Sequence, residues 1–185
     1  MKAALTLTLI LLSATTALAE PLTGKAAKKL LFPVKGASVD MRPDSGLSEQ
    51  DQTVLGTVAA QQPYYGAIAI SPGEGLMSEA TVAAANYHDT AAAEAAALAD
   101  CNGKKKAKAP CVIAALIRPD GYEARPLQLS LDATTAFRKD YDGMGSALAI
   151  SAATGGWGIA QGAEAAVAAC AAKAGAKDCT VVVAD

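Results

Sequence analysis

The chain carries the same short pattern twice, and this internal repeat restricts its fold more than any other feature. Residues 66–71 (GAIAIS) align with residues 146–151 (SALAIS). In both copies an alanine-rich segment follows, with one cysteine at its end and a second cysteine at the start of an apolar run, namely Cys101 and Cys111, then Cys170 and Cys179. Matching features in a fixed order indicate duplicated folding units. We therefore expect two related units, residues 64–118 and residues 146–185.

Each copy is predicted to open with a strand and to continue as a hairpin. The opening runs are short, apolar and flanked by glycine or serine, which favours strands. A glycine-containing turn follows in both copies and predicts second strands at residues 76–82 and 157–161. The apolar runs that begin with Cys111 and Cys179 predict a third strand in each copy.

An alanine-rich helix is expected between the second and third strands of each copy. In the first copy Asp89 or Thr90 caps a helix that reaches Cys101, and Gly103 ends it in a left-handed conformation. In the second copy the helix covers residues 163–174. Alanine has the highest helix propensity, and neither segment contains a breaker. The predicted fold class is α+β, with two duplicated ββαβ units whose strands form antiparallel sheet.

Residues 1–19 have the composition of a secretory signal. Lys2 gives a positive start, residues 3–12 are apolar, and the segment ends in the small residues that a signal peptidase accepts. The apolar run is too short to cross a bilayer, which needs about 20 residues. We expect cleavage between Ala19 and Glu20 and a periplasmic or secreted mature protein without a membrane span.

The four cysteines occupy equivalent places in the two copies. One lies in the last turn of the predicted helix and the other begins the next strand, about nine residues later. An even number of cysteines in an exported chain indicates disulfides, and the short C-x-x-C spacing of zinc sites is missing. Of the three pairings, Cys101–Cys111 with Cys170–Cys179 needs no contact between copies, so we predict it. Closing so short a loop stabilises the fold by roughly 2.7 kcal/mol.

Charge and composition exclude one class of partner and predict a thin core. Removing the leader takes away only Lys2, which leaves 15 basic and 18 acidic residues. Proteins that bind nucleic acids carry a basic surplus, so we expect no nucleic-acid partner. Many of the 52% hydrophobic residues are alanine, and aromatic residues make up only 4%. Small side chains bury little area each, so we expect disulfides to supplement the core.

Two segments lie outside the repeated units. Residues 20–63 are predicted as an N-terminal helical extension with two helices, the second of which Ser48 caps. Residues 119–145 are predicted as a linker with an extra strand at residues 127–131, where apolar and polar side chains alternate. Asp132 is expected to cap a helix after that strand.

No combination of residues points to a catalytic, metal or cofactor site. His88 is the only histidine, and its position before a helix cap predicts an exposed loop residue. A lone histidine without a nearby nucleophile or second ligand supports neither general-base catalysis nor zinc binding. The acidic residues are scattered, and their spacing selects no carboxylate pair for sugar hydrolysis. The glycine-rich residues 155–158 lack the pattern of a phosphate-binding loop.

Two features are candidate contacts for a partner. The one cluster of like charges lies in the loop between the first two cysteines and consists of Lys104, Lys105, Lys106 and Lys108. It would be either a solubilising loop tip or a contact for an anionic partner, such as an acidic protein or an envelope polymer. Trp157 is expected to pack against the alanine-rich helix, with Met77 as its counterpart in the first copy. A surface role for Trp157, Tyr64 and Tyr65 is the alternative, because aromatic residues anchor interfaces.

These motifs together resemble a bacterial family of small exported domains of unknown function that occur in tandem. The resemblance covers about residues 64–185 and rests on the YGAIAISP and ALAIS strands, the Gly-Trp-Gly of the second hairpin and the cysteine positions. Leu76 and Met77 replace the Gly-Trp element in the first copy, which also holds an insertion. The family has no accepted catalytic residues, so the resemblance implies none. Some similar proteins carry a 5-aminolevulinate synthase label, but that chemistry needs a larger, cytosolic fold and a Schiff-base lysine.

The sequence therefore favours an exported, non-catalytic binding or interaction module without a cofactor. An exported hydrolase is one alternative. The other is an inhibitor of an exported hydrolase, in which the loop at residues 102–110 enters a cleft of its partner. A deep pocket with convergent acids would favour the enzyme, whereas a rigid, protruding lysine loop would favour the inhibitor.

Overall fold

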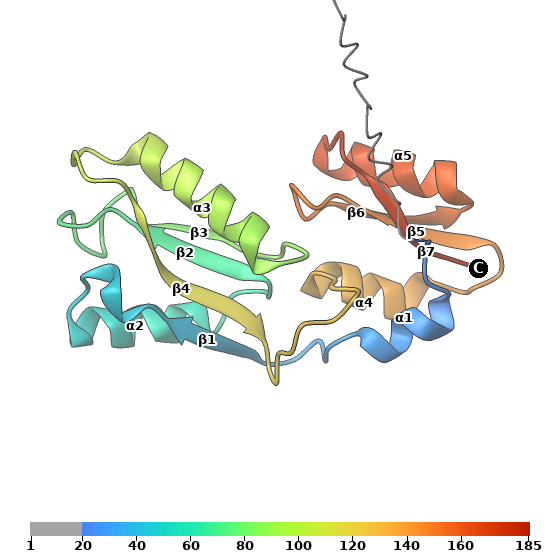
Figure 1. The fold of residues 1–185 in the computed structure, drawn as a ribbon, viewed down its shortest axis with the longest axis horizontal. Helices are drawn as coiled ribbons and strands as arrows, with labels where there is room; N and C mark the ends of the chain where they lie inside the picture. Colours follow the sequence, from blue (N-terminus) through green and yellow to red (C-terminus); the bar gives the residue numbers. More distant parts are fainter. Residues whose placement is uncertain (1–19) are drawn as a thin grey trace, which may run out of the picture.

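The computed structural model describes residues 20–185 and contains two antiparallel β-sheets side by side, each with helices packed against it (Figure 1). The predicted signal peptide, residues 1–19, lies outside the described residues. In chain order the elements are α1 (Gly24–Leu30), β1 (Ala37–Met41), the 3-10 turn η1 (Pro43–Ser45), α2 (Glu49–Ala59), β2 (Gly66–Ile70), β3 (Val82–Ala84), α3 (Thr90–Lys104), β4 (Val112–Pro119), α4 (Leu131–Asp140), β5 (Ser146–Ile150), β6 (Trp157–Gln161), α5 (Ala163–Ala174) and β7 (Thr180–Ala184). We call β1 to β4 with α2 and α3 the first body, and β5 to β7 with α1, α4 and α5 the second body.

The first sheet has the strand order β1-β4-β2-β3, and its two faces carry different kinds of side chain. Ala67 and Ala69 of β2 face the alanine-rich helix α3. Ile68 and Ile70 face the other way and pack with Leu55 of α2. Because side chains alternate along a strand, the core is divided into a layer of small residues under α3 and a layer of branched residues over α2.

The second sheet has the order β6-β5-β7 and repeats this division. Ala147 and Ala149 of β5 face Ala166 of α5. Leu148 points to the opposite face and packs with Phe137 of α4. The second body thus also places small residues under its alanine-rich helix and larger residues on the other side of the sheet.

The start of the described chain is joined to the last strand. The backbone N–H of Leu22 donates to the carbonyl oxygen of Val182, and the N–H of Ala184 donates to the carbonyl oxygen of Leu22, both at 2.9 Å. The N–H of Gly24 donates to the side-chain carboxylate of Asp185, at 3.2 and 3.0 Å from its two oxygens. These bonds hold α1 against the second sheet.

Both bodies contain the same ββαβ unit. The elements β2, β3, α3 and β4 correspond in order to β5, β6, α5 and β7, and the strand orders β4-β2-β3 and β7-β5-β6 match. The pairing of the first and third strands shifts at the same place in both units, between Ile68 and Ala69 and between Leu148 and Ala149. The predicted α+β class, with antiparallel sheets and helix-to-strand disulfides, is confirmed.

One glycine lets α5 approach its sheet more closely than a side chain would allow. In the first unit Ala69 of β2 pairs with Val82, and at the equivalent place in the second unit Ala149 of β5 pairs with Gly158. A Cβ atom added at Gly158 would lie 2.3 Å from the backbone nitrogen of Cys170 and 2.6 Å from the carbonyl oxygen of Ala166. The helix α5 therefore lies directly against the backbone of β6.

The structure differs from the sequence prediction in the first unit. The second strand is Val82–Ala84 instead of residues 76–82, because the residues before it form a loop in which the hydroxyl of Ser78 donates to Glu74. Gly103 does not end the helix, since α3 continues through it to Lys104 and then leaves in an extended conformation. Asp89 does cap this helix, and its side chain accepts from the N–H of Ala92 at 2.7 Å.

The segments outside the repeat also differ from their prediction. Residues 127–130 pair with no strand, and Ser130 instead of Asp132 caps α4 by accepting from the N–H of Ala133 at 3.2 Å. The extension at residues 20–63 contains its two helices but also contributes β1, which pairs with β4. The first unit therefore gains an edge strand that the second unit does not have within the described residues.

Candidate functional site

Both predicted disulfides, Cys101–Cys111 and Cys170–Cys179, are present, and the Cα atoms are 6.1 Å apart in each. In each unit the first cysteine is fully buried and belongs to the cluster that packs the helix on the sheet. Each disulfide closes the loop that leads from the helix to the third strand. These two loops are therefore fixed at both ends.

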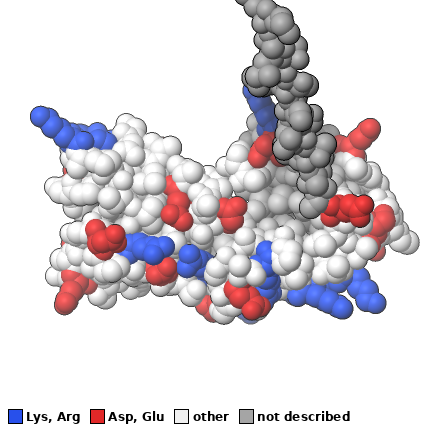
Figure 2. All heavy atoms as spheres, in the orientation of Figure 1, with Lys and Arg blue, Asp and Glu red and all other residues white. Residues whose placement is uncertain are grey.

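The lysine loop, which we define as residues 104–110, protrudes at the end of the first body. Figure 2 shows blue side chains projecting where α3 ends in Figure 1. Lys104 belongs to the last turn of α3 and forms an ion pair with Asp100 at 2.8 Å. Lys106 and Lys108 are exposed. The four predicted lysines thus lie together, but only part of the cluster is free of polar partners.

Hydrogen bonds fold the lysine loop back on itself. The ammonium group of Lys105 donates to the carbonyl oxygens of Ala107 at 3.0 Å and Lys108 at 3.3 Å. At the base of the loop, the side-chain oxygen of Asn102 accepts from the N–H of Cys111 at 3.1 Å. The ordering of the loop therefore does not depend on the disulfide alone.

A carboxylate of the first hairpin holds the middle of the lysine loop. One oxygen of Glu74 accepts from the backbone N–H groups of Lys106 at 2.9 Å and Ala107 at 2.8 Å, and from the hydroxyl of Ser71 at 2.6 Å. The other oxygen accepts from the hydroxyl of Ser78 at 3.0 Å. These bonds, led by that of Ser71, lower the pKa of Glu74 to about 2, so its carboxylate stays charged in mild acid.

The second unit contains a similar connection, but here the acidic residue lies in the loop closed by the disulfide and its partners lie in the hairpin turn. Asp178, in the loop closed by the second disulfide, accepts from the hydroxyl of Ser151 at 2.6 Å and from the N–H of Ala153 at 2.9 Å. The bond from Ser151 contributes most to lowering the pKa of Asp178. In both units a carboxylate therefore joins the hairpin turn to the loop closed by the disulfide.

The sequence prediction included neither of these two contacts. The available signal was the serine that ends the first strand of each copy, Ser71 and Ser151, which are 1% and 0% exposed. A buried hydroxyl beside a turn requires a hydrogen-bond partner. A hydrogen-bond partner from a neighbouring segment was therefore to be expected in both copies, although the signal does not say which residue supplies it.

Trp157 lies on the face of the second sheet opposite α5. It is half-buried against the cluster that contains Leu148 and Phe137, so its core packing is with this cluster instead of with the alanine-rich helix, from which one side chain reaches it. The cause is strand alternation, because Gly158 takes the position that faces α5. Lys173 of α5 reaches over the indole, with its ammonium nitrogen 3.2 Å from the ring centroid. Such a cation–π contact covers one face of the ring.

The other aromatic candidates are not on the surface. Tyr64 and Tyr65 are 0% and 1% exposed and pack with Phe32, so the alternative of a surface role was wrong for both. Met77 was predicted as the counterpart of Trp157, but it lies in the loop before β3 and is 96% exposed. The extra residues of the first hairpin explain this difference.

His88 is buried, and the prediction of an exposed loop residue was wrong. The residue is 3% exposed, and its ring bonds backbone groups of Ser130 and Gly156, which are far away in the sequence. Neither contact involves a serine hydroxyl, so the ring is not placed to activate a nucleophile.

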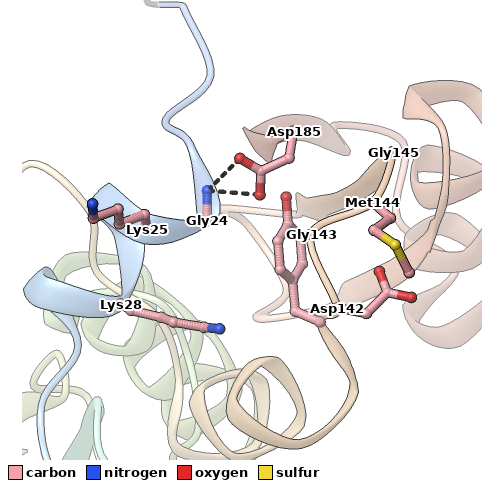
Figure 3. A pocket seen from close by; sticks show the side chains of 9 residues that line it. Gly24, Lys25, Lys28, Asp142, Gly143, Met144, Gly145 and Asp185 are labelled. Atoms are coloured by element: carbon pink, nitrogen blue, oxygen red, sulfur yellow. Dashed lines mark hydrogen bonds between the residues drawn. The ribbon is translucent and has the colours of Figure 1, made fainter.

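A cavity of about 630 Å³ lies between the start of α1 and the loop from α4 to β5 (Figure 3). Asp185 points to Gly24 and accepts from its N–H, and the hydroxyl of Tyr141 donates to the carbonyl oxygen of Ser146 at 2.9 Å. Burial, with the nearby Asp185, raises the pKa of Tyr141 above its usual value. Lys28, on the exposed face of α1, lines the same cavity. The hydrogen bonds of Asp185 and Tyr141 thus join the start of α1 and the end of α4 to the second sheet.

A second cavity, of about 570 Å³, lies beside the edge of β7. Leu22, Leu127 and Val182 are among its lining residues, and Glu20 is the only ionisable residue in the described part of its wall. This cavity has the apolar character of a binding site. It lacks the convergent acids that hydrolysis of a sugar requires.

Residues 20–185 contain no cluster of three or more His, Cys, Asp or Glu side chains that could hold a metal ion. Over the same part of the chain, no helix combines the length and the apolar character needed to cross a bilayer. Comparison with family models, with curated proteins and with solved structures found no match for this chain.

Proposed function

We propose that this chain is an exported, non-catalytic binding module that contacts an anionic partner through the lysine loop. The observation that carries the proposal is that this loop is both exposed and fixed. The disulfide Cys101–Cys111 holds its ends, and Glu74 binds its middle. A loop that already has its bound shape loses little entropy on association. We also propose that the chain belongs to the family of tandem exported domains that its repeat resembles.

The disulfides support the proposed location. Disulfides form and persist in the periplasm and outside the cell, and they are rare in the cytosol of mesophiles. Each disulfide joins two cysteines of the same ββαβ unit, one disulfide in each unit. They are consistent with the leader predicted at residues 1–19 and with a mature protein that begins at Glu20.

The distribution of charge favours an anionic partner. Four lysines lie within five positions of a chain whose overall formal charge is −2. Asp100 pairs with Lys104 alone. The corresponding segment of the second unit contains two lysines, Lys173 and Lys177, with Asp178 beside the second, so the cluster of four belongs to the first unit. Exposed cations accelerate association with acidic surfaces, and salt weakens this effect.

An acidic protein surface is the partner that we favour over a flexible polymer. The lysine loop keeps one shape because its backbone is bonded to Glu74 and its ends are cross-linked. A fixed arrangement of charges improves selectivity most when the partner is also structured, since complementary charges then meet in one register.

Affinity capture tests this proposal, with the oxidised mature protein beginning at Glu20 as bait in an envelope extract. The variant with Lys104, Lys105, Lys106 and Lys108 all changed to Gln should bind the captured protein at least about tenfold more weakly than the wild type. Reduction of the disulfides should weaken capture as well. Raising the salt concentration should release the partner from the wild type.

The control variant removes the same number of charges elsewhere, by changing Lys25, Lys28, Lys29 and Lys139 to Gln. These residues belong to α1 and α4 in the second body, and this variant should capture the partner as well as the wild type does. Equal capture by the wild type and the lysine-loop variant would refute the proposal. Equal loss in both variants would show a general charge effect and would refute the assignment to the loop.

The second candidate function is inhibition of an exported hydrolase. It is favoured because the lysine loop protrudes and is fixed by three separate constraints, its disulfide, Glu74 and the side chain of Asn102. Glycoside hydrolases carry paired carboxylates in their clefts, and ammonium groups complement such a site. If the captured protein is a hydrolase, the mature chain should lower its activity and the lysine-loop variant should not.

A further inference from the structure

His88 connects the two bodies through backbone groups. It lies between β3 and α3 in the first body, and its Nε2 is 3.0 Å from the carbonyl oxygen of Gly156 in the β5–β6 hairpin. The N–H of Ser130, at the start of α4, donates to Nδ1 at 3.0 Å. Both partners belong to the second body. Within residues 20–185 the chain itself connects the bodies only through residues 31–36 and 120–129.

The two bonds define the protonation state of the ring. A backbone N–H can only donate, so Nδ1 of His88 must be an unprotonated acceptor for Ser130. A carbonyl oxygen can only accept, so Nε2 must carry the proton that bonds Gly156. The geometry thus selects the neutral imidazole in one tautomer, and neither backbone partner can change its role.

We propose that His88 is an acid-sensitive latch, in which a proton that binds to Nδ1 breaks the bond from Ser130 and loosens the joint between the two bodies. The new N–H of the ring would face the N–H of Ser130, so two donors would meet in a buried place. A buried N–H without an acceptor is strongly unfavourable. The charged ring therefore favours an opened joint in which water reaches both groups. This inference does not depend on the identity of a binding partner.

The charged groups around His88 do not reverse this preference. Asp89 caps α3, Asp132 of α4 accepts from the amide of Asn86 at 2.8 Å, and Asp178 is bonded to the β5–β6 hairpin. All three carboxylates are thus already hydrogen-bonded. Burial lowers the pKa of His88, and this effect exceeds the opposing influence of the carbonyl that it bonds and of Asp89 and Asp178.

The two bodies are in close backbone contact around His88, so a change at the ring affects the neighbouring contacts between them. A Cβ atom added at Gly155 would lie 2.6 Å from the carbonyl oxygen of Asn86, which shows that the second hairpin rests on the backbone of the first body. The N–H of Leu131 donates across the same joint to the carbonyl oxygen of Tyr64 at 3.1 Å. The surface is hollowed between the bodies on the side of α3 and α5 (Figure 2), which leaves room for a change in their angle.

Amide hydrogen exchange followed by NMR tests the latch in the untagged mature protein between about pH 7.5 and pH 5. Because His88 is the only histidine, the ring nitrogen signals report its tautomer and titration directly. Below about pH 6.5, the protection factors of the Ser130 and Leu131 amides should fall about tenfold per pH unit until the ring of the closed joint titrates. The amide of Thr134, which donates to the Ser130 carbonyl within the second body, should keep its protection.

The variant His88→Gln removes the titration and keeps a donor for the Gly156 carbonyl. Protection of Ser130 and Leu131 should then be independent of pH. If this variant does not fold, the proposal is still tested by the wild-type protein, through the titration of the His88 ring and the pH dependence of protection at Ser130 and Leu131. A fall at Ser130 alone would show that one bond breaks without movement of the bodies, and this would overturn the proposal. Unchanged protection at both amides, with or without titration of the ring, would overturn it as well.

Discussion

The substitution Gly158→Ala tests whether close contact between α5 and β6 stabilises the second unit. The new Cβ would lie 2.3 Å from the nitrogen of Cys170, 2.6 Å from the oxygen of Ala166 and 2.7 Å from the carbonyl carbon of Ala169. Carbon atoms in optimal contact are about 3.5–4.0 Å apart, so the helix would have to move by about 1 Å. All three atoms are backbone, and Cys170 is tied to Cys179. We expect a loss of about 2–3 kcal/mol, at the upper end of the range for overpacked cores.

Urea unfolding of the oxidised protein measures this loss. With a slope of about 2 kcal/mol per molar urea, the midpoint should fall by about 1 M. Gly103→Ala is the matched control, since Gly103 lies within α3 and an added Cβ meets nothing within 4 Å. That variant should be more stable by up to about 1 kcal/mol. A loss below about 0.5 kcal/mol for Gly158→Ala would refute the reasoning, because alanine favours a strand more than glycine where space exists.

Three further predictions concern the disulfides, His88 and Glu74. Changing Cys170 and Cys179 together to Ala should lower the free energy of unfolding by about 2.6 kcal/mol in urea titrations, from the entropy of the short loop; a loss under about 1 kcal/mol would contradict the loop model. Because burial lowers the pKa of His88, the unfolded chain binds the proton first as the pH falls. The free energy of unfolding should therefore be at its maximum above about pH 6.5. Below that pH it should decrease by up to about 1.4 kcal/mol per pH unit, until the ring of the folded protein is protonated as well. Urea unfolding at a series of pH values measures this decrease, and an equal decrease in His88→Gln would exclude His88 as its cause. Glu74→Gln should let a lysine-specific protease cut the lysine loop faster, because an amide carries fewer acceptors than a carboxylate. The exposed Glu79→Gln is the control, and equal cleavage of the two variants would contradict a role for Glu74.

The internal repeat made most of the second unit predictable from the sequence. Residues 157–161 and 163–174 were predicted as strand and helix and are found at these bounds. The pairing of the cysteines followed from their equivalent places at the end of a helix and the start of a strand. Local signals were sufficient here because a hairpin, a helix and its return strand are all close in sequence.

The first hairpin and the linker were not predictable in the same way. Leu76 and Met77 have the apolar character of a strand, but the side chain of Glu74 organises their surroundings as a loop. Leu127 and Leu129 alternate with polar residues and both reach the core, yet no neighbouring strand pairs with their backbone. Alternation reports which side chains are buried, and it does not report whether the backbone has a partner.

The candidate sites depended even more on distant contacts. The lysines were identified correctly as a cluster, because they are adjacent in the sequence. The burial of His88 follows from Ser130 and Gly156, which are 42 and 68 positions away. The residues next to His88 in the sequence do not indicate these contacts. They also lack the regular spacing of apolar residues that marks a buried face, so the sequence predicted an exposed histidine.

The bonds of Leu22 and Gly24 to the last strand and to Asp185 imply an order of assembly. A chain emerges with its N-terminus first, and the first sheet needs only residues 37–119 to complete its pairing. We expect that sheet to form before β7 has been synthesised, when α1 does not yet have the strand against which it packs. The first described residues, which follow Glu20, would then be the last to dock. In the exported protein that we propose, the predicted cleavage point before Glu20 would stay accessible until β7 has formed.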